Sequence, residues 1–352
     1  MAHQFTDTFC TVNSTAQAAY EAIGGGTYTY SSSYARFAPP PGCQSGGVLI
    51  PVNGYLRKNL SSNQQILTAF VSFGALGMPT AGQQSAVVVF LDNGTFQTGL
   101  QWTPSGALQF VQNITNIGPA SNPGLIQTAT KPINGIEVQV KIASSGGGFV
   151  NCWLNGALVI SATGLTTQTS ANAYANQVQI GGQSGQFGGS DQGFYTDYLR
   201  VWDSTGTTQN APVGFDVQPV TKLASKVGLT TQFTPNGLPA NYQCVSVVPP
   251  NGGDFVAASI AGIHDDYGVP VAGFTTAPNQ VVVSSYYQKT DSNTRTYTNG
   301  VLSGTAVGTG ATFTANSGLT WVQSCIANDP ATNQPWTAAG ADAAHIYHTE
   351  VS

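Results

Sequence analysis

Two short stretches of the chain carry the side chains best suited to acid–base or metal chemistry. His264-Asp265-Asp266 places an imidazole before two adjacent carboxylates, which raise the local negative potential and offer oxygen ligands to calcium. His345-Ile346-Tyr347-His348 spaces two imidazoles by three residues, which suits metal binding on a helix face better than on a strand. We interpret the first stretch as a solvated turn before Tyr267-Gly268. The second stretch has no identifiable third ligand, so no metal site is predicted.

Glycan hydrolysis on a β-sandwich would require a different pattern. Two carboxylates must flank the sugar bond, so that one attacks and the other donates a proton. The chain has three glutamates, Glu21, Glu137 and Glu350, which are remote from one another, and it has no Glu-x-Asp-x-Glu. Nucleophile-elbow, phosphate-loop and dinucleotide fingerprints are also missing from the sequence. The sequence therefore predicts that the chain is not an enzyme, has no catalytic residue and takes no cofactor.

The composition indicates an all-β fold. Only 7% of the 352 residues are charged, against about 25% in an average soluble protein, and 42 residues are glycine. Helix surfaces are normally built from Glu, Lys, Arg and Ala, so this composition favours short strands joined by turns. The net charge is -5, and the ten basic residues are scattered except for Arg57-Lys58. Nucleic-acid binding needs clustered positive charge, so that class of partner is excluded.

Cysteine usage and the N-terminus give further expectations. The five cysteines are an odd number at wide spacing and match no zinc or redox signature, and Cys152 is expected to be a buried thiol. Met1 to Phe9 has neither the basic start nor the apolar core of a signal peptide. Apolar runs such as Ala86 to Leu91 are too short to span a membrane. We therefore expect a chain made in the cytoplasm with no membrane partner.

Several strands can be predicted from local pattern. Phe149 to Ile160 has two apolar arms around Asn155-Gly156, a pair that predicts a tight hairpin with positive φ at both turn residues. Ala86 to Leu91 is apolar on both faces, which indicates a central strand. Ile136 to Ile142 alternates cleanly between apolar and polar residues, so Glu137 is expected to face water.

The chain exceeds the usual size of one domain. Ser204 to Gly214 carries no core pattern and marks a boundary. We predict an N-terminal segment (1–46) that contributes first strands or a docking arm and contains a helix from Asn13 to Ile23. A β-sandwich (47–205), a linker (206–214) and a smaller β-domain (215–352) are expected to follow.

Three stretches in order carry a family resemblance. They are the Asn-Gly hairpin, the strand from Gln177 to Gly182 that ends in glycines, and Asp197-Tyr198-Leu199-Arg200-Val201-Trp202-Asp203. Together they resemble the end of a concanavalin-A-like (laminin-G-like) jelly roll. The resemblance implies that residues 47–205 form such a jelly roll, followed by a second, smaller β-sandwich.

More narrowly, the chain is similar to a group of bacteriophage virion proteins that carry this jelly roll. The likeness runs from about Gly47 to the end, and three later motifs keep a fixed order: Val247 to Val256, Lys289 to Arg295, and Asp329 to Thr337. It implies a non-enzymatic virion structural protein on the particle exterior, as a tail, collar or capsid-decorating subunit. The implied partners are other virion proteins and further copies of the chain, and no catalytic residue is carried over.

The alternative is a carbohydrate-binding adhesin or receptor-binding protein. Its partner would be a host-surface glycan, and its candidate glycan-contacting residues are Tyr30, Tyr195 and Trp202, whose rings could pack against sugars. A glycan hydrolase is the third hypothesis, which the missing carboxylate pair disfavours.

Overall fold

The structure, a computed structural model, describes residues 3–7, 20–31, 47–127, 133–182, 192–203, 220–247 and 252–352. Contacts between Cα atoms divide the chain into two units, with a division between Pro219 and Val220. Each is described by itself, as unit 1 (before Val220) and unit 2 (from Val220 on). The predicted linker lies outside the described residues, so the predicted domain bounds stay a prediction.

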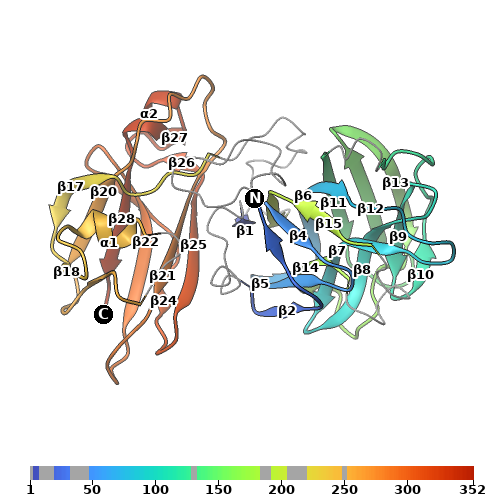
Figure 1. The fold of residues 1–352 in the computed structure, drawn as a ribbon, viewed down its shortest axis with the longest axis horizontal. Coiled ribbons are helices and arrows are strands. Elements are labelled where there is room, and N and C mark those ends of the chain that lie inside the picture. The colour runs from blue at the N-terminus through green and yellow to red at the C-terminus, as the bar shows by residue number, and fades with distance from the viewer. Residues whose placement is uncertain are drawn as a thin grey trace. The chain divides into compact units, whose positions relative to one another are not determined.

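Nine strands form the first sheet of unit 1 (Figure 1). Its order is β13-β12-β11-β6-β15-β4-β3, with β16 paired to β6 and β1 paired to β16. The strands are β1 (His3–Asp7), β3 (Thr29–Tyr30), β4 (Val48–Ile50), β6 (Ile66–Ala75), β11 (Asn134–Lys141), β12 (Gly148–Leu154), β13 (Ala157–Leu165), β15 (Phe194–Thr196) and β16 (Leu199–Asp203).

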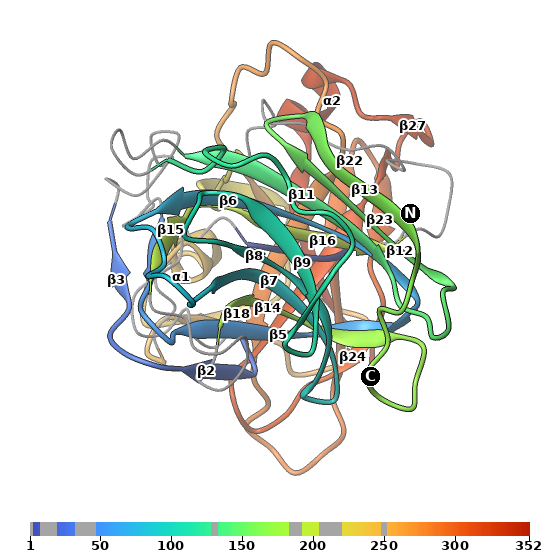
Figure 2. The ribbon, with the colours of Figure 1, turned by 90° about the vertical axis from the view of Figure 1, so that its right-hand side faces the viewer.

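Seven strands form the second sheet of unit 1, which can be followed in Figure 2. Its order is β10-β9-β8-β7-β14-β5-β2, and neighbours in both sheets are antiparallel. The strands are β2 (Ala22–Gly24), β5 (Tyr55–Gln64), β7 (Ser85–Asp92), β8 (Thr95–Trp102), β9 (Leu108–Gln112), β10 (Thr115–Ile117) and β14 (Ala175–Gly181). Because β6 and β7, and again β13 and β14, belong to different sheets, the chain crosses between layers as a jelly roll does.

Aromatic side chains join the two sheets of unit 1. Trp102 of the second sheet lies 4.9 Å from Phe73 and 6.0 Å from Phe194, both in the first sheet, measured between ring centroids. Every residue of β7 is buried, and the strand lies between β8 and β14. This confirms the central position predicted for Ala86 to Leu91 and the β-sandwich class.

The predicted hairpin is confirmed. Asn155 and Gly156 connect β12 to β13 with φ values of 50° and 82°, the left-handed backbone that this turn requires. Cys152 of β12 is fully buried, and burial raises the pKa of its thiol, as expected of a small apolar side chain in a core.

Two local predictions are wrong. Glu137 is only 2% exposed, because its strand is central and its neighbours across the sheet are Phe70 and Trp153. At the end of the predicted N-terminal helix, Ala22–Gly24 is instead the strand β2, which pairs with β5, while residues 8–19 lie outside the described chain. Edge pairing overrides the weak helix preference of this alanine-containing segment.

Ser72 of β6 bridges the break between β15 and β16. Its hydroxyl oxygen accepts hydrogen bonds from the backbone N–H groups of Asp197 (2.8 Å) and Tyr198 (3.0 Å), and it lies 3.2 Å from Thr196 Oγ1. Both strands pair with β6, and Ser72 is fully buried. The hydroxyl therefore satisfies two amides where the strand is interrupted.

Unit 2 has a six-stranded main sheet with the path β17-β20-β28-β22-β23, and β24 also pairs with β22. A hairpin-like pair, β21 and β25, forms a second layer, and two further strand pairs and two short helices complete the described part. The elements are β17 (Lys226–Thr231), β18 (Thr234–Asn236), α1 (Asn241–Val245), β19 (Phe255–Ala257), β20 (His264–Gly268), β21 (Val281–Tyr287), β22 (Thr296–Ser303), β23 (Ala306–Thr309), β24 (Phe313–Thr314), β25 (Thr320–Ile326), β26 (Asn328–Asp329), β27 (Gln334–Pro335), α2 (Ala338–Ala343) and β28 (His345–Glu350).

The core of unit 2 lies between the main sheet and the β21–β25 pair. Val301 of the main sheet packs with Val283 and Ile326, and Ile346 of β28 packs against the same cluster. Trp336 closes it and donates its indole N–H to the Ile326 carbonyl at 2.8 Å. Unit 2 is thus a smaller β-sandwich, and no helix of the described chain is long and apolar enough to cross a membrane.

Replacing Ser72 by alanine should lower the free energy of unfolding by about 2–4 kcal/mol, because two buried N–H groups lose their acceptor. Urea denaturation followed by circular dichroism measures the change. Ser161→Ala is the matched control, since the hydroxyl of Ser161 makes an exposed hydrogen bond to Asn151, and its effect should stay within about 0.5 kcal/mol. Equal effects of the two substitutions would contradict the role of Ser72.

Candidate functional site

The two stretches with chemically capable side chains lie on neighbouring strands of unit 2. β20 and β28 are antiparallel, and Asp265 is opposite His348 while Asp266 is opposite Tyr347. Three of the four histidines of the chain are in these two strands. The pairing therefore gathers most of the groups that titrate near neutral pH into one part of the molecule.

Strand alternation divides these side chains between the two faces of the main sheet. Ile346 and His348 face the β21–β25 layer, where Ile346 packs on the core and His348 contacts Tyr287. The other set points to the opposite side, which we call the outer face. This outer-face cluster consists of His264, Asp266, His345 and Tyr347.

Asp266 holds the imidazole of His345 in the outer-face cluster. The side chain of Asp266 is fully buried, and its Oδ1 lies 2.5 Å from His345 Nδ1. Its carboxylate also accepts the backbone N–H groups of Leu229 (2.8 Å) and Thr230 (2.7 Å). The side chain of His345 is 21% exposed. With Nδ1–H directed to the carboxylate, Nε2 is the ring atom left to accept a hydrogen bond or a proton.

Gly228 permits this arrangement because β17 passes very close to Asp266. A Cβ atom at Gly228 would lie 1.9 Å from Asp266 Oδ1 and 2.1 Å from its carbonyl oxygen. The pairing of β17 with β20 also shifts register between Val227 and Thr231. The shift brings the amides of the intervening segment onto the carboxylate, so that the edge strand wraps around the buried charge.

Two aromatic rings adjoin this pair on the outer face. The rings of His264 and Tyr347 lie 5.3 Å apart with an interplanar angle of 35°. Both side chains are half-buried, which leaves part of each ring accessible. The outer face thus presents an oriented imidazole beside two packed rings, a combination that can accept a hydroxyl group and cover an apolar ring face.

Asp265 has a structural role on the inner face. Its Oδ1 accepts the backbone N–H groups of Gln232 (2.5 Å) and Phe233 (2.8 Å), and its Oδ2 accepts from Asn241 Nδ2 (2.6 Å) and the Tyr267 hydroxyl (2.8 Å). Burial and this carboxylate raise the pKa of Tyr267, so the phenol keeps its proton. With four donors satisfied, Asp265 offers no oxygen to a ligand.

His348 is part of a buried polar network. Its Nδ1 lies 2.6 Å from the Tyr287 hydroxyl and its Nε2 lies 3.5 Å from Ser285 Oγ, which accepts a hydrogen bond from Asn299 at 2.9 Å. Burial lowers the pKa of His348 to about 4, although the Asp265 carboxylate opposes the shift. Ser285 is only 8% exposed, so this hydroxyl–imidazole–phenol series is a neutral core network, not a reaction site.

These observations correct the interpretation of both stretches. His264 to Gly268 is a strand with Asp265 and Asp266 0% and 1% exposed, not a solvated turn. His345 to Glu350 is also a strand, so His345 and His348 point to opposite faces and cannot share an ion. No group of three or more metal-ligating side chains occurs among the described residues.

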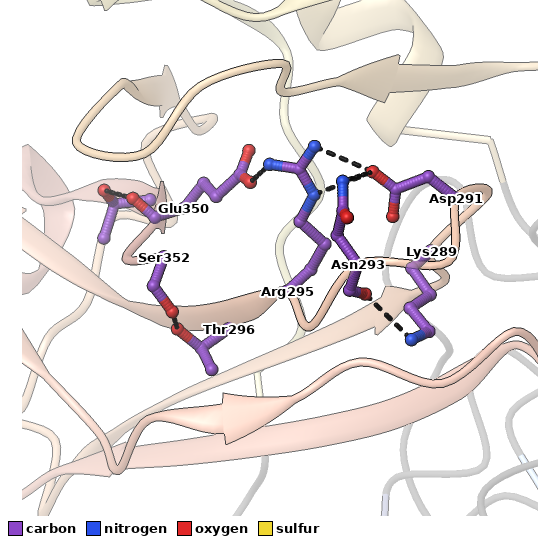
Figure 3. Close-up of polar contacts among 8 residues, drawn as sticks. Lys289, Asp291, Asn293, Arg295, Thr296, Glu350 and Ser352 are labelled. Atoms are coloured by element: carbon purple, nitrogen blue, oxygen red, sulfur yellow. Dashed lines mark hydrogen bonds and ion pairs between the residues drawn. The ribbon is translucent and has the colours of Figure 1, made fainter.

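The motif from Lys289 to Arg295 forms a self-contained polar loop (Figure 3). Arg295 donates from Nε (3.1 Å) and Nη2 (2.8 Å) to Asp291 Oδ2 and from Nη1 (2.7 Å) to Glu350 Oε1. Asn293 also donates to Asp291, and Lys289 Nζ donates to the Asn293 carbonyl at 2.9 Å. The hydrogen bonds from Arg295 lower the pKa of Asp291. This geometry closes the loop onto the end of β28.

The glutamates are used separately, as the sequence indicated. Glu21 pairs with Lys58 at 2.8 Å, Glu137 is buried in unit 1, and Glu350 pairs with Arg295 in unit 2. Among the described residues, no ion pair links two of them to a common cation. The three glutamates therefore do not form the carboxylate pair of a glycan hydrolase.

The three predicted glycan-contacting rings differ in their accessibility. Tyr30, at the end of β3, is half-buried. Tyr195 is 5% exposed over Gly74, and Trp202 is 2% exposed and lies against Phe70, Tyr198 and the Arg200 guanidinium. The structure does not gather them into one site. Glycan contact at these positions stays a prediction, and Tyr30 is the one with accessible ring surface.

No protein-family model matches the chain, and no curated protein matches it in sequence. Among solved structures, an endo-β-1,4-glucuronan lyase from the fungus Trichoderma reesei is 13% identical with a TM-score of 0.40, over 57% of this chain and 96% of the lyase. A cellulose-induced protein is 12% identical with a TM-score of 0.37, over 60% of this chain and all of its own. An alginate lyase in complex with alginate tetrasaccharide is 13% identical with a TM-score of 0.33, over 56% and 93%.

These comparisons contradict the function predicted from the sequence. The similar structures are named as polysaccharide lyases and, for Trypanosoma rangeli, as a sialidase, and nothing among them indicates a phage protein. The predictions of a non-enzymatic bacteriophage virion structural protein and of a chain that is not an enzyme are therefore wrong. At these identities and TM-scores the likeness concerns the β-sandwich fold, and it assigns no activity to this chain.

The low pKa of His348 predicts a loss of stability in mild acid. The folded-state pKa of about 4 lies below the unfolded value of about 6.5, so the unfolded chain binds more protons between these values. Stability that is present above pH 6.5 should fall as the pH decreases, by about 2 kcal/mol from pH 7 to pH 5. Urea denaturation at both pH values measures it, with His348→Gln as the comparison. A variant whose stability falls as steeply as the wild type would contradict the assignment.

Proposed function

We propose that this chain is a glycan-binding protein and that the outer-face cluster of unit 2 contacts the sugar. The observation that carries the proposal is the imidazole of His345, held by a buried carboxylate beside the His264 and Tyr347 rings. The low charge of the whole chain agrees with it, because uncharged polar surface suits contact with sugar hydroxyl groups.

The chemistry of the cluster matches the two sides of a sugar ring. The C–H face of a pyranose is apolar and can lie against an aromatic ring, as Tyr347 and His264 present here. Its edge carries hydroxyl groups, which can donate to His345 Nε2. Sugars thus fit an aromatic surface with a few fixed polar groups at its border.

The hydrogen bonds behind His345 make the contact rigid before the ligand arrives. Asp266 is itself fixed by two backbone amides, at 2.7 and 2.8 Å, so the imidazole is held by the fold and not by the ligand. Side chains held in their bound conformation lose less entropy on binding. The buried carboxylate is therefore a positioning group for the proposed site.

Tyr347→Ala should weaken glycan binding about five- to tenfold, because it removes a ring from the contact surface. A glycan array identifies a ligand for the wild-type chain, and isothermal titration calorimetry then compares the variants. Tyr242→Ala, which removes a half-buried tyrosine from α1 of the same unit, is the matched control and should bind as the wild type does. A wild-type chain that binds no glycan, or equal binding by both variants, would contradict the proposal.

Glycan cleavage is a second candidate function, favoured by the Asp266–His345 pair itself. A carboxylate that orients an imidazole leaves Nε2 able to take or give a proton in a reaction. If the cluster supports cleavage, the wild-type chain should release new chain ends from the bound polysaccharide and His345→Gln should release at least about a hundredfold fewer. A reducing-end assay measures this, and Tyr242→Ala should keep the wild-type rate. Binding without release of ends would leave glycan binding as the function.

A further inference from the structure

Unit 1 contains a guanidinium that has no carboxylate partner in the described chain. Arg57 of β5 lies opposite Gln179 of β14, and its Nε and Nη2 both donate to Gln179 Oε1, at 3.0 and 2.7 Å. A guanidinium carries five N–H donors, so three N–H groups stay unused by the residues that the structure describes. Three other cations, Lys58, Lys222 and Arg295, each pair with a carboxylate.

The position of Arg57 makes this an unfavourable arrangement without a ligand. The side chain is half-buried, and burial lowers its pKa with no carboxylate to compensate. Removing a charge from water without a partner costs free energy. An oxyanion that accepts the unused N–H groups would recover that free energy, and the planar guanidinium is suited to carboxylate in a two-bonded geometry.

The neighbouring side chains fix Arg57 in place. Gln179 is fully buried, and its Nε2 donates to the Gly181 carbonyl at 3.0 Å, so the acceptor that holds the guanidinium cannot turn freely. The guanidinium carbon lies 5.2 Å from the centre of the Tyr55 ring. That ring lies over Gly24 of β2, where a Cβ would approach Tyr55 Cε1 to 2.2 Å. The ring and the cation thus form one fixed surface.

Side-chain amides border the other side of the guanidinium. Gln177 Oε1 accepts the backbone N–H of Gly94 at 2.7 Å, and Gln177 Nε2 donates to Asn59 Oδ1 at 2.7 Å. The turn at Gly94 comes close to Arg57, since a Cβ there would lie 3.6 Å from Arg57 Nη1. Asn59 is exposed. A ligand at the guanidinium would therefore meet an aromatic ring on one side and hydrogen-bonding amides on the other.

We propose that Arg57, with Tyr55 and the Gln177–Asn59 amide pair, binds the carboxylate of an acidic saccharide. The guanidinium accepts the uronate carboxylate, the Tyr55 ring lies against the sugar face, and the amides contact hydroxyl groups. The site belongs to unit 1 and requires neither His345 nor Tyr347. It adds recognition of a charged group, which the outer-face cluster of unit 2 does not provide.

Isothermal titration calorimetry with an oligogalacturonate, its methyl ester and inorganic sulfate tests the proposal on the full chain. Arg57→Ala should weaken oligogalacturonate binding at least about tenfold, as should methylation of the ligand, because each removes the charge-assisted hydrogen bonds. Gln179→Glu should do the same without deleting the arginine, since it places a carboxylate on Arg57 and satisfies its charge internally. Lys141→Ala removes one positive charge elsewhere in unit 1 and should bind as the wild type does.

The remaining outcomes are decisive as well. His345→Ala should keep full affinity for the oligogalacturonate, so failure of the site proposed for unit 2 would leave this one intact. A wild-type chain that binds no oligogalacturonate, or binds the methyl ester equally well, overturns the proposal. Unchanged binding by both Arg57→Ala and Gln179→Glu overturns it too. Sulfate that binds as tightly as the saccharide would show a site for a free oxyanion instead.

Discussion

The arrangement of unit 2 depends on burying two adjacent carboxylates. Asp265 and Asp266 point to opposite faces of the main sheet, and between them they accept four backbone N–H groups, those of Leu229, Thr230, Gln232 and Phe233. Because a buried carboxylate is unfavourable unless it is hydrogen-bonded, the segment from 229 to 233 has to follow β20 closely. The irregular register of β17 and the close approach of Gly228 are consequences of this constraint.

The same hydrogen bonds that satisfy these carboxylates give two histidines opposite properties. His345 and His348 are three residues apart on one strand, yet one is partly exposed against Asp266 and the other is in the polar core with Tyr287. A histidine in the core loses its charged form and contributes to packing, whereas a histidine on the outer face keeps a ring nitrogen for solvent or ligand. The sheet thus separates a structural role from a binding role within a single turn of sequence.

Local sequence pattern was sufficient where local chemistry decides the structure. The Asn155-Gly156 turn and the doubly buried β7 follow from φ preferences and apolar runs, and both are present. It was insufficient for His264-Asp265-Asp266, because the groups that make a strand out of this polar run are amides more than 30 residues upstream and a strand 79 residues downstream. Glu137 failed for the same reason, since its aromatic neighbours come from other strands. Gly228 was the remaining local signal, a small residue where backbone must approach a side chain.

A chain with so few charges makes each charged side chain informative. In a highly charged protein an unpaired arginine would mean little, because many surface ion pairs contribute almost nothing. Here charged residues are 7% of the sequence, and Lys58, Lys222 and Arg295 have carboxylate partners while Arg57 has an amide oxygen in that place. Gln179 is nearly the same size as glutamate, which would satisfy the guanidinium completely. That a neutral acceptor occupies this buried position leaves the positive charge available, and this is the condition for an oxyanion to bind there with a net gain.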